Sequence, residues 1–435
     1  MLTVSCVVLL LCLNILRGSC EAASFESEFE SGPALLIVSY DGFRPDYLYR
    51  NVTPTLKKLR SEGTSARYMY PVFPTKTFVN HFTIGTGLYP GNHGVLANSV
   101  YDSTRGLLNY GFDLFHYNES TLPIWSANEK AGGHSGCIWP GSGYEYHGVS
   151  CTFQKEHNGS IPFEDRVDTI MNWFTHEQTP TNLVMLYIEE PDEQSHMYGP
   201  NSIHITNAAA RVDNLTRYIE DKLIEHKLQN RVNVIYLSDH GMVGVPPSNF
   251  IDFTVFLANN TYNIYGSTPV LQVVPKDLTV EHEIFANLTK GAEQNGHFKV
   301  YNEHNLPARW HAHNRRRMGP ILVVADSGYG FQDMVIAAQN YRKKFNVSFT
   351  NESRYGVHGY DNAEPDMNAF FLAKGPLFSK GKRIRAIQMI DLYNLFCLIL
   401  KIECGVNDGS KNPQIWKKLF ARHKSDQNTT TLHHV

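Results

Sequence analysis

The chain has 435 residues, 42% of them hydrophobic, and its 39 Lys and Arg nearly balance its 42 Asp and Glu. This apolar fraction and the small net charge of −3 exclude an intrinsically disordered protein. The balance of charge also argues against a general nucleic-acid binder, which needs a basic excess to neutralise phosphates. The 20 histidines are the one unusual count in the composition.

The N-terminal segment differs from everything after it. Residues 7–16 form an apolar run that is too short to cross a bilayer, and small and polar residues follow it. The pattern predicts a cleaved secretory signal over residues 1–22, although no Lys or Arg precedes the apolar run. A core helix at the N-terminus is the alternative interpretation.

Sequons and cysteines both agree with an extracellular protein. Four cysteines follow the predicted signal, and an even count in a secreted protein suggests two disulfides, most simply the short-range pairs, although three connectivities are open. Nine Asn-x-Ser/Thr sequons predict N-linked glycans. They lie at Asn51, Asn118, Asn158, Asn214, Asn259, Asn287, Asn346, Asn351 and Asn428.

Short apolar runs separated by helical patterns recur along the chain. Helices are expected from Thr53-Pro54 to Gly63, from about Ser202 to Lys227, and over Met389–Leu400. Five runs have the length and the β-branched content of buried parallel strands. They are Ala34–Tyr40, Leu183–Ile188, Val232–Leu237, Ile321–Ala325 and Ala369–Ala373.

This alternation predicts an α/β fold with a mostly parallel central sheet and helices on both faces. One catalytic domain is expected over residues 33–405, with insertions around the sheet at 241–357 and a polar C-terminal tail at 406–435, whose last 25 residues or so are expected to fray. The Met389–Leu400 run contains Asp391 and Asn394 and is too short for a membrane span. We therefore expect no membrane anchor and a secreted, extracellular product.

Three aspartates follow three of the predicted strands. Asp41 comes directly after the first strand, Asp192 lies four residues beyond Ile188, and Asp239 lies two residues beyond Leu237. In open α/β sheets the carboxyl ends of the strands form the ligand-binding edge. Clustered carboxylates repel one another unless a cation compensates them, so the pattern favours a metal site.

Histidines accompany two of the three aspartates. His196 stands four residues after Asp192, and His240 is adjacent to Asp239. Mixed Asp and His ligands with no thiolate suit zinc, or a similar divalent ion, in a catalytic site. Either Asp–His pair, taken alone, could instead be a pair of polar surface residues.

A hydroxyl nucleophile is expected near the metal. Thr77 precedes a helical stretch that ends near Gly85-Thr86-Gly87, so it could sit at a helix N-terminus that faces the same sheet edge. Local chemistry does not distinguish Thr77 from Thr75, and Thr77 could also be a simple helix cap.

Eight ordered motifs give the chain a specific resemblance. Together they are similar to the ectonucleotide pyrophosphatase/phosphodiesterase family, over about residues 34–405, and to its short members with a catalytic domain alone. The motifs are Val38-Ser-Tyr-Asp-Gly-Phe-Arg44, Phe73-Pro-Thr-Lys-Thr-Phe78, Thr86-Gly-Leu-Tyr-Pro90, His93-Gly94, Trp139-Pro-Gly141, Glu189-Glu-Pro-Asp192 with His196 and Tyr198-Gly-Pro200, Ser238-Asp-His-Gly-Met242, and His358-Gly-Tyr-Asp-Asn362.

The resemblance implies an alkaline-phosphatase-like fold that holds two zinc ions. One zinc would be held by Asp192, His196 and His358. The other would be held by Asp41, Asp239, His240 and the Thr77 oxygen.

The same resemblance assigns the chemistry. Thr77 would attack the phosphorus of a phosphodiester or pyrophosphate, and zinc-activated water would hydrolyse the covalent phosphothreonyl intermediate. Asn98 matches the family asparagine that joins the Thr77 backbone N–H in binding a phosphate oxygen, an oxyanion-hole role worth about 3 kcal/mol.

Substrate-binding residues follow less directly. Phe78 matches an aromatic that stacks on the nucleobase, and His157 falls where nucleotide-hydrolysing relatives place a second aromatic, usually tyrosine. Gly143 replaces an aspartate that helps recognise adenine in some relatives, which puts a strict adenine preference in doubt. Trp139 could wall the pocket or pack inside.

These features predict a secreted, zinc-dependent nucleotide pyrophosphatase/phosphodiesterase that releases nucleoside 5′-monophosphates from extracellular nucleotides. A phosphodiesterase acting on choline-type (lyso)phospholipids is the first alternative, although the sequence shows no cage for a quaternary ammonium. A catalytically inactive secreted glycoprotein and a phosphomonoesterase are the others. No nucleic-acid polymer is expected as a partner.

Overall fold

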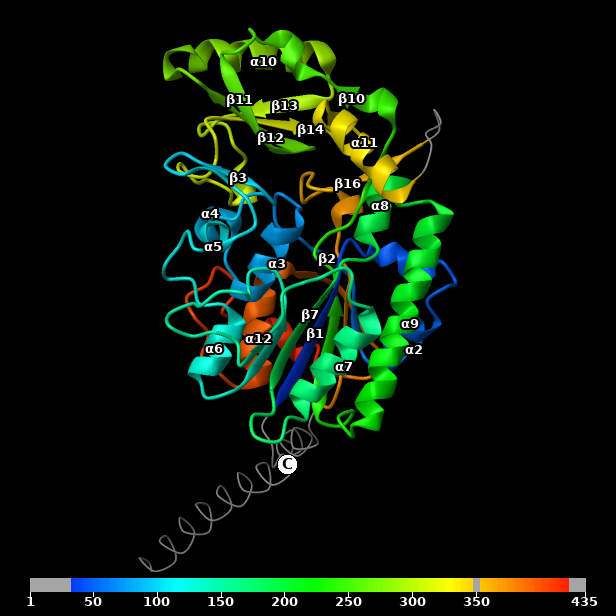
Figure 1. Ribbon diagram of the computed structural model, residues 1–435. Coiled ribbons are helices and arrows are strands. Elements are labelled where there is room, and N and C mark those ends of the chain that lie inside the picture. The colour runs from blue at the N-terminus through cyan, green and yellow to red at the C-terminus, as the bar shows by residue number, and fades with distance from the viewer. Residues whose placement is uncertain (1–32, 347–352, 422–435) are drawn as a thin grey trace, which may run out of the picture.

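An eight-stranded sheet lies at the centre of the computed structural model, which describes residues 33–346 and 353–421 (Figure 1). The strand order is β18-β2-β17-β8-β1-β7-β5-β6. All neighbours are parallel except β17, which runs antiparallel to both β2 and β8. The strands are β1 (Ala34–Tyr40), β2 (Thr64–Tyr70), β5 (Ser135–Ile138), β6 (Phe153–Gln154), β7 (Leu183–Ile188), β8 (Val232–Leu237), β17 (Phe371–Lys374) and β18 (Lys382–Gln388).

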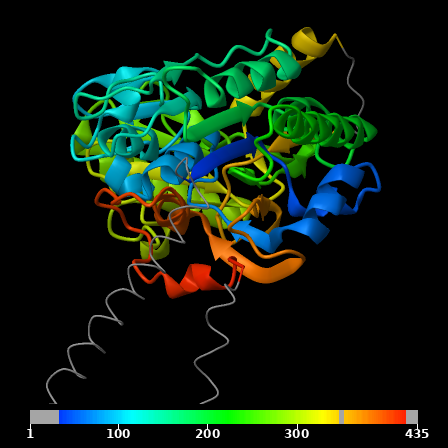
Figure 2. The same ribbon diagram turned by 90° about the horizontal axis from the view of Figure 1, so that it is seen from below.

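Helices cover both faces of this sheet, as the view from below shows (Figure 2). Side chains of β1 alternate between the two layers, with Leu35 and Ile37 in one core and Leu36 and Val38 in the other. The first core is completed by α3 (Thr77–Thr86), α6 (Ile124–Lys130) and α12 (Leu392–Leu400). The second is completed by α2 (Pro54–Glu62), α7 (Phe163–Phe174) and α9 (Ile203–Glu225).

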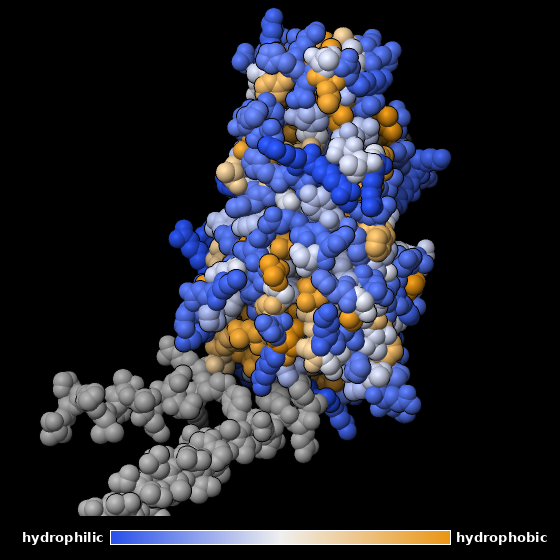
Figure 3. Space-filling model, turned by 90° about the vertical axis from the view of Figure 1, so that its left-hand side faces the viewer, coloured by the Kyte–Doolittle hydropathy of each residue, from blue (hydrophilic) through white to orange (hydrophobic). Residues whose placement is uncertain are grey.

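A smaller antiparallel sheet lies beyond one end of the central sheet, at the top of Figure 1. Its order is β11-β12-β14-β13, and it has a hydrophobic core of its own with α10 and α11. On the side of the molecule that Figure 3 shows, hydrophilic residues cover most of the surface of this smaller unit. The elements are β11 (Tyr262–Ser267), β12 (Val270–Pro275), β13 (Phe298–Tyr301), β14 (Ile321–Ala325), α10 (Glu281–Asn295) and α11 (Asp333–Phe345).

Short elements join these two units and surround the edge between them. They include two antiparallel strand pairs, β3 with β4 and β9 with β16, and the parallel pair β10 with β15. The elements are α4 (Pro90–His93), β3 (Val100–Asp102), β4 (Gly106–Leu108), α5 (Phe112–Phe115), α8 (Asp192–Tyr198), β9 (Val243–Val245), β10 (Phe250–Ile251), β15 (Gly330–Phe331) and β16 (Tyr355–Val357). The short helix α13 (Gln414–Lys417) follows α12 and packs in the main core instead.

Most of the predicted elements are confirmed, but two strands differ in direction. The predicted helices correspond to α2, α9 and α12, and three predicted strands correspond to β1, β7 and β8. The run Ile321–Ala325 is β14, which is antiparallel and belongs to the smaller sheet. The run Ala369–Ala373 contributes to β17, the antiparallel strand of the central sheet. Both predictions of parallel strands were wrong because burial on both faces, and not direction, makes a strand uniformly apolar.

The described part of the predicted polar tail, residues 406–421, also differs from expectation. Trp416 and Leu419 are 2% and 0% exposed and belong to the main core. The Leu419 backbone carbonyl accepts hydrogen bonds from the Thr64 hydroxyl and the Ser379 N–H. This part of the segment is therefore packed, and the prediction that about the last 25 residues fray was wrong for those of them that the structure describes.

Two disulfides join the short-range cysteine pairs, Cys137–Cys151 and Cys397–Cys404. The simplest of the three possible connectivities is thus the observed one. Within the described residues, no helix is both long and apolar enough to cross a bilayer. The predicted signal at residues 1–22 lies outside them.

Candidate active site

Three buried aspartates meet at the carboxyl edge of the central sheet. Asp41 follows β1, Asp239 follows β8, and Asp192 is the first residue of α8, shortly after β7. These strands are neighbours in the order β8-β1-β7, and all three aspartates are at most 9% exposed. The sequence-based expectation that the aspartates gather at one sheet edge is therefore confirmed.

The aspartates and three histidines form two groups with the composition of metal sites. We call Asp41, Asp239 and His240 the nucleophile-side cluster, and Asp192, His196 and His358 the α8-side cluster. Within each cluster the potential ligand atoms lie within 4.8 Å of one another. Mixed carboxylate and imidazole ligands without thiolate suit zinc or a similar divalent cation.

Each carboxylate has an oxygen that the described residues leave without a hydrogen bond. These buried atoms are Oδ1 of Asp41, Oδ1 of Asp192 and Oδ2 of Asp239. Burying a charged atom without a hydrogen bond costs a free energy of roughly several kcal/mol. Such atoms are therefore rare unless an ion compensates their charge. Their presence in both clusters indicates that the residues fit a metal ion at each.

The three histidines are oriented for coordination through Nε2. Nδ1 of His196 lies 2.9 Å from the Gly356 carbonyl oxygen, and Nδ1 of His240 lies 2.9 Å from the Gly241 carbonyl oxygen. The Nδ1 of His358 likewise lies 2.9 Å from the Thr75 carbonyl oxygen. A carbonyl oxygen only accepts, so every Nδ1 must carry the proton and donate. This arrangement fixes the tautomer and leaves Nε2 free to bind a cation.

The Nε2 of His240 faces two carboxylates. It lies 2.9 Å from Oδ2 of Asp239 and 3.3 Å from Oδ1 of Asp41. Because Nδ1 already carries a proton, an uncharged His240 would aim a lone pair at those negative oxygens. Only a cation between them, a second proton or a metal ion, makes the contact favourable.

The pKa shifts of the cluster residues also favour a bound cation. Burial raises the pKa of Asp41 well above its usual range, and the negative charges of Asp239 and Asp192 raise it further. Burial lowers the pKa of His358 well below its usual value, and the neighbouring His240 lowers it further. A neutral His358 is the form that binds a metal ion, whereas the carboxylates need a positive charge to stay ionised together.

Thr77 faces the nucleophile-side cluster. It is the first residue of α3, as expected, and its Oγ1 lies 3.4 Å from Nε2 of His240. The hydroxyl of Thr75 is instead engaged, since it donates to the Tyr360 carbonyl oxygen and accepts from the Gly359 N–H. Of the two threonines that local sequence chemistry left open, Thr77 is therefore the one whose hydroxyl faces the cluster.

The Asn98 side chain lies beside the first turn of α3. Its Oδ1 accepts the Phe78 N–H at 3.0 Å. The carbonyl end of the amide is thereby fixed beside the first turn of α3, where backbone N–H groups have no partner within the helix. Such a cluster of donors is suited to an anionic oxygen.

Two residues that the sequence did not single out support these groups. His81 lies 2.8 Å through Nδ1 from the Thr77 carbonyl oxygen, and the same Nδ1 is 3.4 Å from Oδ2 of Asp239. Tyr187 donates its hydroxyl to Oδ2 of Asp41 at 2.6 Å. His81 lies four residues after Thr77, and Tyr187 lies near the end of β7. These positions were the only signal for the two residues in the sequence.

An aromatic wall lies next to Thr77. It consists of Phe78, Tyr110 and Phe115, whose ring centroids are 5.0 to 6.2 Å apart. Phe115 is buried whereas Tyr110 is 50% exposed, and the Tyr110 hydroxyl accepts the Gly141 N–H at 3.4 Å. Sequence reasoning found Phe78 but missed Tyr110, which no motif contains.

The other predicted pocket residues have different surroundings. Trp139 is 3% exposed and donates its indole N–H to the His81 carbonyl oxygen, so of its two possible roles the structure favours interior packing. His157 is exposed, and its Nε2 lies 2.9 Å from Oε2 of Glu189. Although burial opposes it, hydrogen bonds from His157 and Arg166 lower the pKa of Glu189 to about 2. This carboxylate therefore stays charged and holds the imidazole of His157 by its edge.

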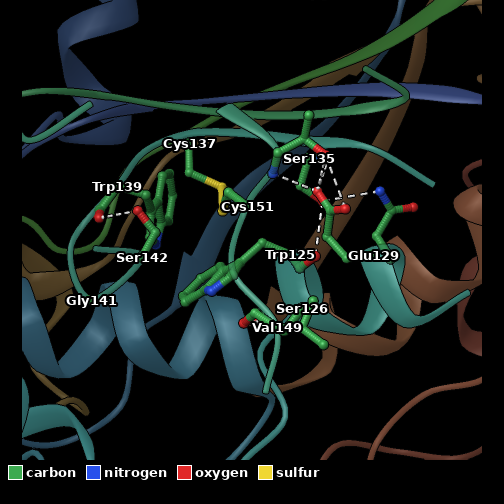
Figure 4. Close-up of a disulfide and its surroundings, with 12 residues drawn as sticks. Trp125, Ser126, Glu129, Ser135, Cys137, Trp139, Gly141, Ser142, Val149 and Cys151 are labelled. Atoms are coloured by element: carbon green, nitrogen blue, oxygen red, sulfur yellow. Dashed lines mark hydrogen bonds between the residues drawn. A yellow bond between two sulfur atoms is a disulfide. The ribbon is translucent and has the colours of Figure 1, made fainter. Parts of the chain in front are cut away.

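The Cys137–Cys151 disulfide supports the loop that carries Trp139 (Figure 4). Next to it, Glu129 accepts the Ser135 N–H at 2.7 Å, and the Ser142 hydroxyl donates to the Trp139 carbonyl oxygen at 2.8 Å. Gly143 follows in the same loop, and a side chain there would meet the Gln154 amide.

Comparison with known proteins agrees with this geometry. The model of the type I phosphodiesterase / nucleotide pyrophosphatase family matches residues 35–361. The chain belongs to this family. It is therefore a hydrolase of the phosphodiesterase and nucleotide pyrophosphatase class, and its fold is alkaline-phosphatase-like.

Individual members of the family are similar over most of the chain. Ectonucleotide pyrophosphatase/phosphodiesterase family member 5 of Homo sapiens is 36% identical, with 89% of this chain and 79% of that protein covered. A bis(5′-adenosyl)-triphosphatase of Xenopus laevis is 33% identical, with 93% and 84% covered. A venom phosphodiesterase of Macrovipera lebetinus is 36% identical over 90% of this chain, which spans 46% of the venom protein.

Solved structures of this family are equally similar. Murine ectonucleotide pyrophosphatase / phosphodiesterase 5 has a TM-score of 0.80 and 33% identity, and 89% of this chain and 100% of that chain are covered. The same values hold for a form of that protein described as inactive, which carries a threonine-to-alanine substitution and is in complex with AMP.

Proposed function

We propose that the protein is a two-zinc nucleotide pyrophosphatase/phosphodiesterase that acts on extracellular nucleotides and releases nucleoside 5′-monophosphates. The observation that carries this proposal is the pair of buried ligand clusters, each with unsatisfied carboxylate oxygens, beside the Thr77 hydroxyl. Zinc ions bound there would lower the pKa of the Thr77 hydroxyl and withdraw negative charge from the reacting phosphate.

The residues of the chain supply the remaining steps. Thr77 attacks phosphorus and the leaving group departs from the opposite side, which leaves a phosphothreonine that water then hydrolyses. The Asn98 amide N–H and the Thr77 backbone N–H bind a non-bridging phosphate oxygen. The hydrogen bond from His81 to the Thr77 carbonyl oxygen holds the first turn of α3 in place during both displacements.

Phe78 and Tyr110 supply an apolar surface for a flat leaving group or nucleobase. Stacking of a base on such rings is worth about 1–3 kcal/mol and tolerates different bases. The relatives named for bis(5′-adenosyl)-triphosphatase activity and the AMP complex support a nucleotide substrate. Glycine at position 143 leaves adenine without a carboxylate at that point of the loop, so we expect several bases to be accepted.

The proposal is tested with a nucleotide p-nitrophenyl ester and purified protein. We expect Thr77→Ala to lower turnover by about 10³-fold or more, because removing a nucleophile leaves only binding and oxyanion contacts. Thr75→Ser retains the second threonine's hydroxyl bonds and is the matched control, with near wild-type turnover. Turnover that survives both Thr77→Ala and a strong chelator would disprove the mechanism.

A substrate panel separates the alternatives. Turnover of a lysophosphatidylcholine above that of all nucleotides would favour the choline-type phosphodiesterase instead. Turnover of a phosphomonoester alone would indicate a phosphomonoesterase. Loss of all turnover with full zinc occupancy would favour a glycoprotein that only binds.

We also propose that the protein is secreted and N-glycosylated. Most of the sequon asparagines in the described residues are exposed, as glycan attachment requires. The exposed ones are Asn51, Asn158, Asn214, Asn259, Asn287 and Asn346. Asn118 is half-buried, and Asn351 and Asn428 lie outside the described residues. A shift to lower mass after glycan removal from secreted protein is the expected result.

A further inference from the structure

Helix α11 packs against the short helix that provides two of the proposed zinc ligands. α11 (Asp333–Phe345) lies beside α8 at the right of Figure 1, and α8 begins at Asp192 and contains His196. The family motifs that identified the site include no residue of α11. Its role therefore has to be argued from its contacts.

Three contacts join the C-terminal half of α11 to α8. The Tyr341 ring stacks on the His196 imidazole with centroids 5.4 Å apart and 9° between the planes. The Phe345 ring meets Tyr198 edge-on at 5.7 Å, and Lys344 forms an ion pair with Glu193. The ion pair is exposed and contributes little, so the two aromatic contacts dominate.

His196 is the ligand histidine that most needs such support. Its side chain is 23% exposed, whereas those of His240 and His358 are 0% and 4% exposed. The rings of His240 and His358 also stack on each other at 3.7 Å with 15° between the planes. His358 meets His196 only at a tilt of 49°.

Within the described part of the chain, the His196 ring is held by one hydrogen bond, at Nδ1. Nδ1 donates to the Gly356 carbonyl oxygen at 2.9 Å, and Nε2 lies 3.2 Å from Oδ2 of Asp192. Because Nδ1 carries the proton, Nε2 makes no hydrogen bond to that carboxylate, so the single bond at the ring edge leaves the ring free to rotate about it. The parallel ring of Tyr341 opposes that rotation.

The other end of α11 is anchored to the segment that carries the nucleophile. The Asp333 carboxylate accepts the Thr268 N–H at 2.8 Å and the Thr268 hydroxyl at 2.6 Å. The Thr268 carbonyl oxygen in turn accepts from Nζ of Lys76 at 2.6 Å, and Lys76 directly precedes Thr77. α11 is thereby held at both ends, which gives Tyr341 a fixed base.

We propose that Tyr341 is a positioning residue for His196, and that its ring holds the imidazole in the plane in which Nε2 binds the metal of the α8-side cluster. This inference rests on the proposed zinc sites but adds a residue to which the family motifs give no role. It acts through His196 and does not touch substrate.

The test compares three variants of the full chain by zinc binding. Tyr341→Leu removes the flat ring but keeps an apolar helix-forming side chain, and Tyr341→Phe keeps the ring. Ile336→Ala is the matched control, because Ile336 is on the same helix and 65% exposed. Zinc affinity of each site is measured by competition with a chromophoric chelator, and Co²⁺-substituted protein gives a visible spectrum of the ligand geometry.

We expect Tyr341→Leu to weaken one of the two zinc sites by about tenfold, the lower end of the effect of groups that orient metal ligands. Its Co²⁺ spectrum changes, and excess zinc restores kcat. Tyr341→Phe and Ile336→Ala keep wild-type affinity at both sites. Wild-type affinity in Tyr341→Leu, or an equal loss in Ile336→Ala, would overturn the inference.

Zinc affinity and the Co²⁺ spectrum are measured without any turnover of substrate. A wild-type protein that binds two zinc ions and hydrolyses no nucleotide would contradict the proposed function, while the comparison of Tyr341 variants would still decide the role of this ring. Unfolding midpoints of the zinc-free variants show whether a loss of affinity reflects a loss of fold.

Discussion

The two ligand clusters and the aromatic wall meet at Thr77, yet they are built in different ways. The carboxylates of the clusters lie within four residues of the ends of β1, β7 and β8, so the hydrogen-bonded central sheet fixes their positions. The wall comes from the start of α3 and from loops and short elements between residues 98 and 115. Rigid strands therefore carry the chemistry, and variable loops carry the contacts that select the substrate.

The two regions also differ in what they lack. The clusters contain buried charged oxygens to which no described residue donates a hydrogen bond, and these oxygens require a cation. The wall has apolar rings with one face partly open, as the 50% exposure of Tyr110 shows, which suits a flat organic group. Changes in the clusters should therefore affect kcat and metal content, whereas changes in the wall should affect KM.

The largest expected effect is that of Asp239→Asn. The substitution keeps the size of the side chain but removes a charge that faces His240 and Thr77. We expect zinc at the nucleophile-side cluster to bind more than about 100-fold more weakly, because even groups that only orient ligands are worth about 10–100-fold. Metal analysis and turnover measure the effect, and Asp252→Asn, at an exposed helix cap, should change neither. Full zinc content in Asp239→Asn would contradict the assignment.

Asn98 lies on the boundary between the two regions and should behave like the clusters. We expect Asn98→Ala to lower kcat by about 100-fold, the effect of losing one oxyanion donor, with KM changed much less. Asn98→Asp retains an acceptor for the Phe78 N–H but no donor, and should be as inactive. Asn109→Ala, at an exposed position after β4, removes an acceptor of the Ser99 hydroxyl but keeps the Asn98 amide, and is the control. A change in KM alone would place Asn98 with the wall.

The stability of the packing beneath the aromatic wall should depend on pH, through His93. His93 packs on Phe82, which packs on Phe115. Nδ1 of His93 accepts the Val95 N–H, and Nε2 lies 3.0 Å from the Thr83 hydroxyl, whose proton is directed to the Leu88 carbonyl oxygen. The imidazole is thus neutral, and burial lowers the pKa of His93 to about 3, with the charge of Arg317 adding to the effect.

The sign of the pH effect follows from this lowered pKa. The unfolded chain takes up a proton near pH 6.5 and the folded chain only near pH 3, so stability is lost as the pH falls between these values. His93→Asn keeps an acceptor for Val95 but cannot be protonated. Its deficit in unfolding free energy should shrink by about 2 kcal/mol between pH 7.5 and pH 5. Urea unfolding at the two pH values measures it, and an unchanged deficit would show that His93 is already charged.

Phe78→Leu should have the smallest effect. We expect an increase in KM of about tenfold for a nucleotide ester, from the loss of stacking, and a nearly constant kcat. Phe112→Leu is the matched control, because Phe112 is 54% exposed and is not part of the wall. An equal change in kcat and KM for both variants would mean that the wall supports the fold and does not bind the base.

The same contrast explains how much the sequence could predict. Asp41, Asp192 and Asp239 were found because strand ends are visible as changes from apolar to acidic residues. The helix start left Thr75 and Thr77 open as the nucleophile, and the family resemblance selected Thr77. His358, by contrast, follows no apolar run and came only from the family resemblance, as did Asn98.

The remaining errors have physical causes. Strand direction leaves no trace in a strand buried on both faces, so β14 and β17 were taken for parallel strands. Tyr110 and Tyr341 reach the site through tertiary contacts with residues more than 30 positions away in the chain, and neither belongs to a motif. Predicting them requires the packing itself.

The order of the ligands along the chain has a consequence for biosynthesis. The nucleophile-side cluster is complete once residue 240 has been made, but the α8-side cluster waits for His358. At about 5–20 residues per second, a growing chain spends on the order of ten seconds with one complete ligand set and one incomplete set. The two ligand sets are therefore completed in a fixed order, and a chain cut between these two points retains only the nucleophile-side cluster complete.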